Sequence, residues 1–470
     1  MIRHPIEPET DMNTKKTLKD AKRRLAALLS LGVLFFSSCS LTDMIELREA
    51  DAGPVPIRER EPAAEAETRA PDPVPETQAA PDMAETAAEL PIPEEAVAWI
   101  EAYEARFGEG SADEVLLTED EIAAYNRRII EECPTVIDIA DVPEEIDGQA
   151  VRDKLLIDLP AVELFNDEGE PFSYDPIRAN AAPETVPDTV VPQRAVITAR
   201  CDMKSLPTGS GLYEGKDRYY SKIQLTELIV GMPVWVLHES ADGEFAFVQS
   251  YYYEGWIPSS SLALCENKEF ILFCEPDDPV TVTVPTVLCG DTVLNMGAAF
   301  PYKESSDGEF TVSVPVRGED GRLALADFEL RKAEAVRGRL PYTMKNFYTE
   351  AFACLGTPYG WGGAGGGLDC SGFVCAVFRT FGVYLPRDTK DQKDHAGTPT
   401  SPDGMSAEEI GAFLLDSRYP VSLHSQGHVM LYLGERDGQT YVIHAPQGGE
   451  VVTVAPLEPE RVLISLVEMK

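Results

Sequence analysis

The sequence predicts an α+β protein in which a helical segment and two blocks of short strands precede a C-terminal domain of helices packed against an antiparallel sheet. Three observations support this class. Helical patterns open the folded part of the chain, short β segments between turn signals follow over residues 195–335, and from Pro341 the pattern is helix, glycine-rich loop, helix and then strands. A chain of 470 residues has room for about two to four domains with substantial cores.

The charge of the chain argues against one class of function. The formal net charge is −40 at pH 7, and no basic stripe that could follow a phosphate backbone is present, so we expect no nucleic acid partner. The nine cysteines are an odd number without zinc-ligand spacing. A disulfide framework is therefore not expected, although Cys265 and Cys274 would be an isolated candidate pair.

Residues 1–39 have the pattern of an export signal. A basic stretch precedes an apolar run from Leu25 to Phe36, which is too short for a comfortable membrane span and is followed by small residues. Met12 would be the start of this signal, because the acidic residues before it do not suit one. The Phe36-Ser37-Ser38-Cys39 end resembles the lipobox of bacterial lipoproteins, in which the cysteine is lipidated, although leucine is usual in place of Phe36. An ordinary signal peptide or a short anchor helix is the alternative.

Lipidation of Cys39 would place the protein in the cell envelope, anchored to a membrane by the lipid and facing the periplasm or the exterior. Residues 40–92 then form a tract rich in Ala, Pro and Glu that lacks apolar periodicity. Such a tract cannot bury enough surface to fold, so we expect a disordered linker that lifts the folded domains away from the membrane.

Residues 93–194 are expected to form the helical N-terminal segment. Helical patterns cover Glu94–Phe107 and Thr118–Cys133, with acidic residues in the first turn of the second helix. Residues 134–194 are irregular and dotted with proline. They could wrap the other domains as an extended strap, and they carry no recognisable chemistry.

Two β-rich blocks follow, at residues 195–265 and 266–335, which we name the first barrel and the second barrel. The first barrel resembles the bacterial SH3-like domains attached to cell-wall hydrolases, through its Gly-Met-Pro-Val, Asp-Gly and Tyr-x-Gly-Trp elements. The second barrel has the same pattern of short predicted strands, although its sequence has little identity with that of the first barrel. The short β segments expected in the first barrel include Val196–Ala199, Pro233–Leu237, Phe245–Gln249 and Gly255–Pro258.

In the C-terminal domain, residues 340–470, one cysteine directly follows a glycine-crowded loop. Cys370 comes after the loop Thr357–Leu368 and opens an apolar, helix-compatible run that ends near Phe381. A thiol at this position would lie at a helix N-terminus, where unpaired N–H groups and the helix dipole favour the thiolate. The pattern therefore predicts a nucleophilic cysteine.

A nucleophilic cysteine needs a base, and the base needs a group that orients it. His428 opens one strand-like run and His444 lies near the end of the next, so the two rings could face one site on an antiparallel pair. His395 and His424 lie in loop-like stretches and rank lower. A Cys/His/His zinc site is the competing use of these side chains, but catalytic zinc usually takes closely spaced ligand pairs. We expect neither a metal nor a cofactor.

Five motifs in about the last 130 residues resemble the NlpC family of papain-like cell-wall cysteine peptidases. With the two barrels and the helical segment, the whole architecture is similar to that of γ-D-glutamyl-L-diamino acid endopeptidases, which act on peptidoglycan stem peptides (murein peptides). The resemblance implies a papain-like catalytic domain. The motifs are Thr357–Gly363, Asp369–Phe373, Leu385–Asp388, Gly427–Gly434 and Tyr441–Ala445.

By matching position, the resemblance implies that Cys370 is the nucleophile, His428 the general base and His444 the residue that orients the base. Tyr359 would help to form the oxyanion hole beside the backbone N–H of Cys370. The substrate-binding residues that the resemblance implies are Trp361, Asp369, Ser371, Arg387, Asp388 and, from the first barrel, Tyr253.

Several of these assignments have alternatives. Asp369 would line the stem-peptide pocket and could pair with the free α-amine of L-alanine, or it could simply cap the helix. Tyr253 could close the pocket from the first barrel or be packed within that barrel. Arg387 could meet a carboxylate. Cys375, one turn after Cys370, is expected to be a core residue, with a redox role as the minor alternative.

The sequence departs from the family before the base histidine. Many members have a proline-glycine-aspartate segment there, whereas this chain reads LLDSRYPVSLHSQGH, which leaves the backbone path open. The expected function is that of a secreted, monomeric cysteine endopeptidase that hydrolyses the γ-D-glutamyl–diamino acid bond and favours a free N-terminal L-alanine. The alternatives are an amidase or acyltransferase on the same thiol fold, and a non-catalytic cell-wall-binding lipoprotein.

Overall fold

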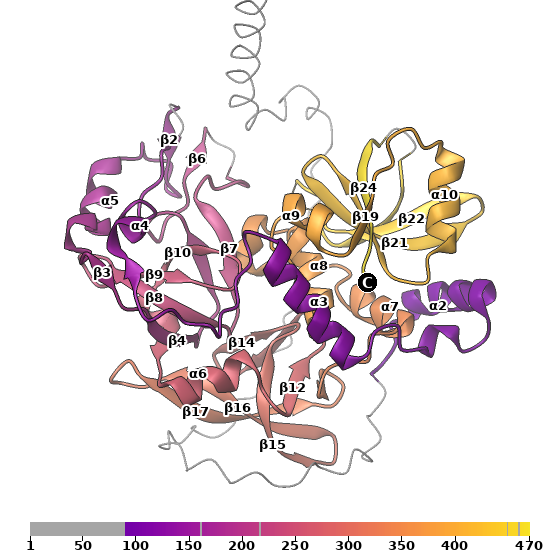
Figure 1. Ribbon diagram of the computed structural model, residues 1–470, viewed down its shortest axis with the longest axis horizontal. Coiled ribbons are helices and arrows are strands. Elements are labelled where there is room, and N and C mark those ends of the chain that lie inside the picture. The colour runs from indigo at the N-terminus through magenta and orange to yellow at the C-terminus, as the bar shows by residue number, and fades with distance from the viewer. Residues whose placement is uncertain (1–89, 160–161, 216–217, 449, 459–460) are drawn as a thin grey trace, which may run out of the picture. The chain divides into compact units, whose positions relative to one another are not determined.

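The structure, a computed structural model, describes residues 90–470 except 160–161, 216–217, 449 and 459–460 (Figure 1). All described residues belong to one compact unit. The predicted signal, the predicted lipidation site Cys39 and nearly all of the predicted linker lie outside the described residues. Within the described part of the chain, no helix is long and apolar enough to cross a membrane.

The two predicted N-terminal helices are confirmed, and they pack against the C-terminal domain. Helix α2 spans Glu94–Phe107 and α3 spans Glu119–Glu132, where Thr118 and Glu121 form a capping box at the start of α3. The buried residues of α2 and α3 share one core with the helices of the C-terminal domain. Distant parts of the chain therefore form one hydrophobic core around the C-terminal helices.

Residues 134–194 lie mainly against the first barrel. Buried side chains of this segment, among them Val151 and Leu155, pack on Phe247 and Trp256 of that barrel. The indole of Trp256 donates a hydrogen bond to the Leu155 carbonyl at 3.0 Å. The segment contains the short elements β1 (Ile146–Asp147), α4 (Gly148–Arg152), β2 (Leu164–Phe165), α5 (Tyr174–Ala181), the 3-10 turn η2 (Pro183–Thr185) and β3 (Thr189–Val190).

The first barrel is a seven-stranded antiparallel sheet in the order β11-β4-β8-β9-β10-β5-β7. Its strand β7 lies at one end of this order, and it is the strand that meets the C-terminal domain. A further short strand, β6 (Tyr213–Glu214), pairs with β2. The strands are β4 (Gln193–Ile197), β5 (Cys201–Lys204), β7 (Gln224–Leu228), β8 (Pro233–Glu239), β9 (Phe245–Gln249), β10 (Glu254–Pro258) and β11 (Leu262–Leu264).

Helix α6 (Asn267–Cys274) connects the two barrels, and its Phe270 and Phe273 are buried in a core that both barrels share. The second barrel has a five-stranded sheet in the order β17-β16-β15-β12-β18 and a separate hairpin, β13-β14. Cys265 and Cys274 are free thiols. The strands are β12 (Pro279–Val282), β13 (Thr286–Cys289), β14 (Thr292–Asn295), β15 (Ala299–Ser306), β16 (Glu309–Arg317), β17 (Leu323–Arg331) and β18 (Ala335–Arg337).

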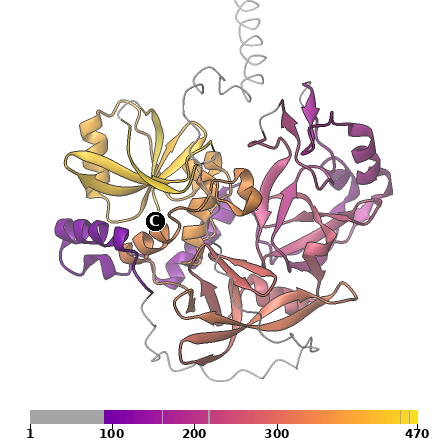
Figure 2. The same ribbon diagram turned by 180° about the vertical axis from the view of Figure 1, so that it is seen from behind.

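The C-terminal domain has a six-stranded antiparallel sheet in the order β19-β24-β20-β21-β22-β23 (yellow in Figures 1 and 2). Its strands are β19 (Thr398–Thr400), β20 (Val421–Ser425), β21 (His428–Arg436), β22 (Gln439–His444), β23 (Thr453–Pro456) and β24 (Leu463–Glu468). Its helices are α7 (Met344–Ala353), α8 (Cys370–Arg379), α9 (Thr389–His395) and α10 (Ala407–Asp416).

Side chains alternate along β21, as the period of a strand requires. Val429 and Leu431 lie in the core that contains α7 and α8, whereas Met430 and Tyr432 lie in the second core, which contains Leu414 of α10. The central sheet is thus covered by helices on both faces. This packing brings the N-terminus of α8 to the start of β21.

Candidate active site

The structure places Cys370 as the first residue of α8, with Asp369 as the N-cap. The Asp369 carboxylate accepts a hydrogen bond from the Gly372 N–H at 2.7 Å, so the helix-cap alternative for Asp369 is observed. Cys370 is buried, and the Val429 N–H donates a hydrogen bond to its sulfur. The thiol therefore lies next to the backbone of the residue that follows His428.

The glycine loop before Cys370 packs directly against strand β7 of the first barrel. Gly362 and Gly363 have φ values of 58° and 80°, in the left-handed region that favours glycine. A Cβ atom on Gly362 would lie 2.8 Å from Cγ of Gln224, and one on Gly363 would lie 2.7 Å from Cγ of Glu227. Glycine is therefore required both by the backbone conformation and by the close approach of the barrel.

The two predicted histidines meet. Nε2 of His428 lies 2.8 Å from Nδ1 of His444, and both side chains are buried. Leu431 of β21 pairs with Ile443 of β22, so one position further along this antiparallel pair His444 lies opposite Met430. His428, two residues before Met430, is therefore the diagonal neighbour of His444 on the same face of the sheet. His428 Nδ1 is buried and has no hydrogen-bond partner among the described residues. The His428 ring is thus held through Nε2. Its Nδ1 is the ring nitrogen that remains available to accept a proton from a thiol.

The protonation states at this site are set mainly by burial. Burial raises the pKa of the Cys370 thiol to about 12, and the nearby Asp369 charge adds to the rise. Burial lowers the pKa of His428 to about 3 and that of His444 to about 4. The helix N-terminus was expected to favour a thiolate, but desolvation outweighs it. The resting site therefore holds a neutral thiol beside neutral imidazoles.

Tyr359 lies close to the nucleophile with an unused donor. Its hydroxyl is buried and has no hydrogen-bond partner among the described residues. Burial raises the pKa of this hydroxyl well above its usual value, and the charge of an ionised Cys370 would raise it further, so the group keeps its proton. An unpaired buried donor is costly and needs an explanation. A developing oxyanion beside Cys370 would supply the missing acceptor.

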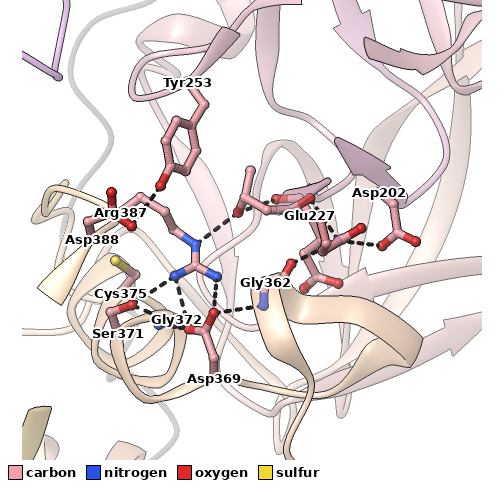
Figure 3. Close-up of polar contacts among 12 residues, drawn as sticks. Asp202, Glu227, Tyr253, Gly362, Asp369, Ser371, Gly372, Cys375, Arg387 and Asp388 are labelled. Carbon is pink, nitrogen blue, oxygen red and sulfur yellow. Dashed lines mark hydrogen bonds and ion pairs between the residues drawn. The ribbon is translucent and has the colours of Figure 1, made fainter. Parts of the chain in front are cut away.

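Arg387 and Asp369 form a buried, two-pronged ion pair (Figure 3). Nη1 and Nη2 of Arg387 donate to the two oxygens of Asp369 at 2.9 and 2.7 Å, and the Gly362 N–H donates to Asp369 Oδ2 at 2.9 Å. Arg387 also donates to the Ser371 hydroxyl at 2.9 Å and to the Thr226 hydroxyl of β7 at 2.8 Å. The structure thus places the guanidinium on Asp369 and not at an open position for a substrate carboxylate.

The other predicted binding residues lie at the junction with the first barrel. The Tyr253 hydroxyl donates to Asp388 Oδ1 at 2.7 Å, so this tyrosine reaches the C-terminal domain while its ring packs with the barrel core (Figure 3). Trp361 is exposed, and its ring meets that of Tyr220 edge to face with a centroid distance of 5.4 Å. These contacts form one wall of the region around the glycine loop.

Sequence reasoning missed the residues of β7. Gln224 donates to the Gly362 carbonyl at 3.2 Å and to Asp202 at 3.0 Å, and Thr226 accepts from Arg387. Glu227 is paired with Arg200, yet burial raises the pKa of Glu227 to about 7. Polar side chains at successive inward positions of the stretch Gln224–Leu228 were the signal that could have revealed this contact.

Cys375, His424 and His395 are the remaining cysteine and histidine candidates, and their positions are those of structural residues. Cys375 is buried, donates to the Pro386 carbonyl and accepts from Gln392, as expected of a core residue. His424 is buried beside the Ser422 hydroxyl, and His395 ends α9. The described residues contain no group of three or more His, Cys, Asp or Glu side chains that could hold a metal ion.

The structure also resolves the backbone path before the base histidine. Helix α10 ends at Asp416, and β20 then leads into a tight hairpin in which Ser425 pairs with His428 across the turn Gln426-Gly427. Gly427 has a φ of 72°, which suits a two-residue hairpin turn. This hairpin sets the start of β21, and with it the position of His428.

A buried cysteine at the start of a helix, next to the backbone of a strand that carries one of two hydrogen-bonded histidines, is the arrangement expected of a papain-like cysteine peptidase domain. Residues 356–463 match the model of the NlpC/P60 family, and residues 212–258 match that of the SH3 domain of SH3b1 type. The C-terminal domain is therefore an NlpC/P60 domain preceded by an SH3b domain. The family and the mixed α+β fold class predicted from the sequence are confirmed.

Two curated relatives are similar to part of this chain. The γ-D-glutamyl-L-lysine dipeptidyl-peptidase of Bacillus subtilis (strain 168) is 30% identical over 178 residues, which cover 36% of this chain and 57% of that protein. The protein of the same name from Bacillus cereus is 26% identical over 252 residues, which cover 49% of this chain and 70% of that protein. The chain thus spans little more than half the length of the Bacillus subtilis relative.

The fold is shared with a solved structure. An NlpC/P60 endopeptidase from Photobacterium damselae subsp. piscicida superposes with a TM-score of 0.60 at 20% sequence identity. The match covers 75% of this chain and 89% of that one. At this identity the likeness supports the fold alone.

Proposed function

We propose that this protein is a cysteine endopeptidase that hydrolyses the γ-D-glutamyl–diamino acid amide bond of peptidoglycan stem peptides. The observation that carries the proposal is the His428–His444 hydrogen bond beside the buried thiol of Cys370. The names of the two Bacillus relatives support this bond as the substrate class. The SH3b domain, a type of module attached to cell-wall hydrolases, supports a cell-wall substrate.

The reaction begins with a neutral thiol and a neutral imidazole. As the sulfur of Cys370 attacks the amide carbonyl, its proton passes to Nδ1 of His428, while His444 holds the ring through Nε2. The new imidazolium then gives this proton to the leaving amine of the diamino acid, and a thioester remains on the sulfur. Water, deprotonated by His428, attacks the thioester and releases the glutamyl carboxylate and the free thiol.

Two donors are placed for the oxyanion of each tetrahedral intermediate. These are the backbone N–H of Cys370 at the helix N-terminus and the unpaired hydroxyl of Tyr359. Both are held by the fold before the substrate binds, so their orientation costs little during the reaction. The Tyr359 hydroxyl, which has no partner among the described residues, would donate to the oxyanion of the tetrahedral intermediate.

The proposal also includes a preference for stem peptides with a free N-terminal L-alanine. The sequence suggested Asp369 as the partner of the α-amine, but both oxygens of Asp369 are occupied by Arg387 and backbone N–H groups. Asp388 is more open, with 38% of its side chain exposed: its Oδ1 accepts from the neutral hydroxyl of Tyr253 at 2.7 Å, and its Oδ2 lies 3.6 Å from the exposed Nζ of Lys390, a contact that the substrate amine would replace. We assign the amine to Asp388, with Asp369 and Ser371 shaping the adjacent wall.

Cleavage of matched synthetic peptides tests the substrate. L-Ala-γ-D-Glu-diamino acid peptides with a free or an acetylated alanine would be incubated with the protein and with Cys370→Ala, and the products identified by mass spectrometry. The proposal expects cutting after D-glutamate in the free peptide only, and none by the variant. Equal cutting of both peptides would refute the amine requirement, whereas a transferred acyl product would favour the acyltransferase alternative.

We also propose that the protein is exported and lipid-anchored in the cell envelope, as a monomer. The support is the basic stretch, the apolar run and the lipobox-like end at Cys39. Membrane fractionation of cells that express the full chain or Cys39→Ser tests it. The full chain should sediment with membranes and the variant should not. Equal membrane fractions would contradict lipidation at Cys39.

A further inference from the structure

A cavity of about 150 Å³ lies where the N-terminal helices, both barrels and the C-terminal domain meet. Its wall is largely apolar and comes from α3, from both barrels, from α6 and from the end of α8. The described residues that line it include none of Cys370, His428, His444 or Tyr359. The cavity is therefore separate from the candidate active site. Apolar side chains in the wall include Ile130, Val136, Ile229, Met232 and Phe273.

Arg379, the last residue of α8, lies in this wall without a counter-ion. Its Nε is buried and unpaired, and no described residue accepts a hydrogen bond from its guanidinium or forms an ion pair with it. The carboxylate that acts on it through space, Glu227, is already paired with Arg200. A buried Nε–H without a partner is unfavourable, because it loses its water without gaining an acceptor.

A second unpaired donor lies in the same wall. The Tyr251 hydroxyl is buried and has no partner among the described residues, and burial raises its pKa well above the usual value, so it remains a donor. Among the other polar lining groups, Arg339 donates to the Tyr384 hydroxyl at 3.1 Å and Asn126 donates to the Gly382 carbonyl at 2.8 Å. The lining therefore offers two free donors.

One acidic residue lies at the edge of the cavity. Asp138 is exposed, and its Oδ1 accepts a hydrogen bond from the Ala140 N–H at 3.0 Å. It makes no ion pair with Arg379. The wall consequently has the positive charges of Arg379 and Arg339, a neutral donor and an apolar surface, a combination that is complementary to an anion with a hydrocarbon body.

We propose that this cavity binds a small organic monocarboxylate, whose carboxylate pairs with Arg379 and accepts from Tyr251 while its apolar body fills the space between the domains. The volume is similar to that of a protein cavity of about 150 Å³ that holds benzene. Ligands of the size of benzoate fit this limit. A guanidinium and a hydroxyl match the two oxygens of a carboxylate. The apolar lining disfavours a free inorganic anion.

Calorimetric titration of the full chain with sodium benzoate tests the proposal, with benzamide as the neutral analogue of the same shape. Benzoate should bind saturably to one site and raise the unfolding temperature, and benzamide should bind at least about tenfold more weakly, which corresponds to about 1.4 kcal/mol. Absence of benzoate binding at about 10 mM, or equal binding of benzamide, would overturn it.

Variants locate the site. Arg379→Met should abolish benzoate binding, whereas Arg322→Met should not, because Arg322 forms an exposed ion pair with Glu266 elsewhere. Tyr251→Phe keeps the ring and removes only the hydroxyl, so it should fold normally and weaken benzoate binding several-fold. This variant keeps the test decisive if Arg379→Met does not fold. Unchanged benzoate affinity in Tyr251→Phe together with binding by a folded Arg379→Met would refute the assignment.

Discussion

Arg387 holds the carboxylate of Asp369 at 2.9 and 2.7 Å while its Nε donates to Thr226 of the first barrel at 2.8 Å. Asp369 caps the helix that begins with Cys370 and also accepts from Gly362 of the glycine loop. One guanidinium therefore joins the barrel, the loop and the helix of the nucleophile. The first barrel therefore helps to hold the helix that begins with Cys370. We expect that loss of this contact between the first barrel and the C-terminal domain lowers activity.

Arg387→Met should lower both stability and activity. The change leaves the Asp369 carboxylate buried without its partner, and losing one member of a buried ion pair costs about 3–5 kcal/mol. Arg322→Met, which breaks an exposed pair with Glu266, should cost less than about 1 kcal/mol. Urea unfolding and kcat measure the two effects. Equal small losses in both variants would show that the Arg387 pair does not support the site.

Thr226→Val tests whether the barrel supports the site through a single hydroxyl. The substitution preserves the shape and leaves Nε of Arg387 without an acceptor, at a cost of about 1–3 kcal/mol. Peptide cleavage by this variant should have a lower kcat/KM, although Thr226 lies in another domain. Thr286→Val, at an exposed position of the second barrel, serves as the control. Identical kinetics in both variants would contradict a supporting role of the barrel.

Tyr359→Phe should separate activity from stability. Removing an oxyanion donor typically lowers kcat by about 10²–10³-fold. The same change removes a buried hydroxyl that has no partner, so the unfolding free energy should stay equal or rise. Single-turnover cleavage and urea unfolding would be compared. A variant with normal kcat, or one that is strongly destabilised, would show that the hydroxyl has another role.

The buried histidine pair predicts how stability depends on pH. Burial lowers the pKa of His428 to about 3 and of His444 to about 4, below the ordinary value of 6.5 that applies in the unfolded chain. Between about pH 6.5 and pH 4 the unfolded state binds more protons, so the free energy of unfolding falls as the pH is lowered. Urea unfolding at several pH values measures this slope.

Two variants connect that slope to the pair. His444→Gln should make the loss of stability with falling pH shallower, because one lowered pKa is removed. Thr286→Val, which changes no titratable group and lies at an exposed position of the second barrel, should leave the slope unchanged. If both variants kept the slope of the unaltered protein, His444 would not be neutral in the folded state.

Local patterns in the sequence predicted much of this fold and site. The helices at Glu94–Phe107 and after Cys370, and the strands that begin at His428 and precede Ala445, follow from the spacing of apolar residues alone. The family resemblance supplied the roles of Cys370, His428 and His444, which the structure brings to one region. These residues lie on short, strongly patterned elements whose local preference agrees with the fold.

Other features depend on contacts between distant parts of the chain. The ion pair of Arg387 with Asp369 joins residues 18 positions apart, and the bond to Thr226 spans 161 positions. No periodicity can show that a polar side chain of a barrel strand will meet a loop of another domain. The raised pKa of the Cys370 thiol likewise follows from burial by the assembled core, whereas the sequence showed only the helix N-terminus.

Cleavage of the γ-D-glutamyl–diamino acid bond by the intact protein and by Cys370→Ala tests the central claim most directly. The free stem peptide would be incubated with each protein, and the products and any acyl adduct on the protein would be followed by mass spectrometry. The account predicts cutting at this bond through a thioester on Cys370 and no cutting by the variant. Retention of cleavage by Cys370→Ala would contradict it.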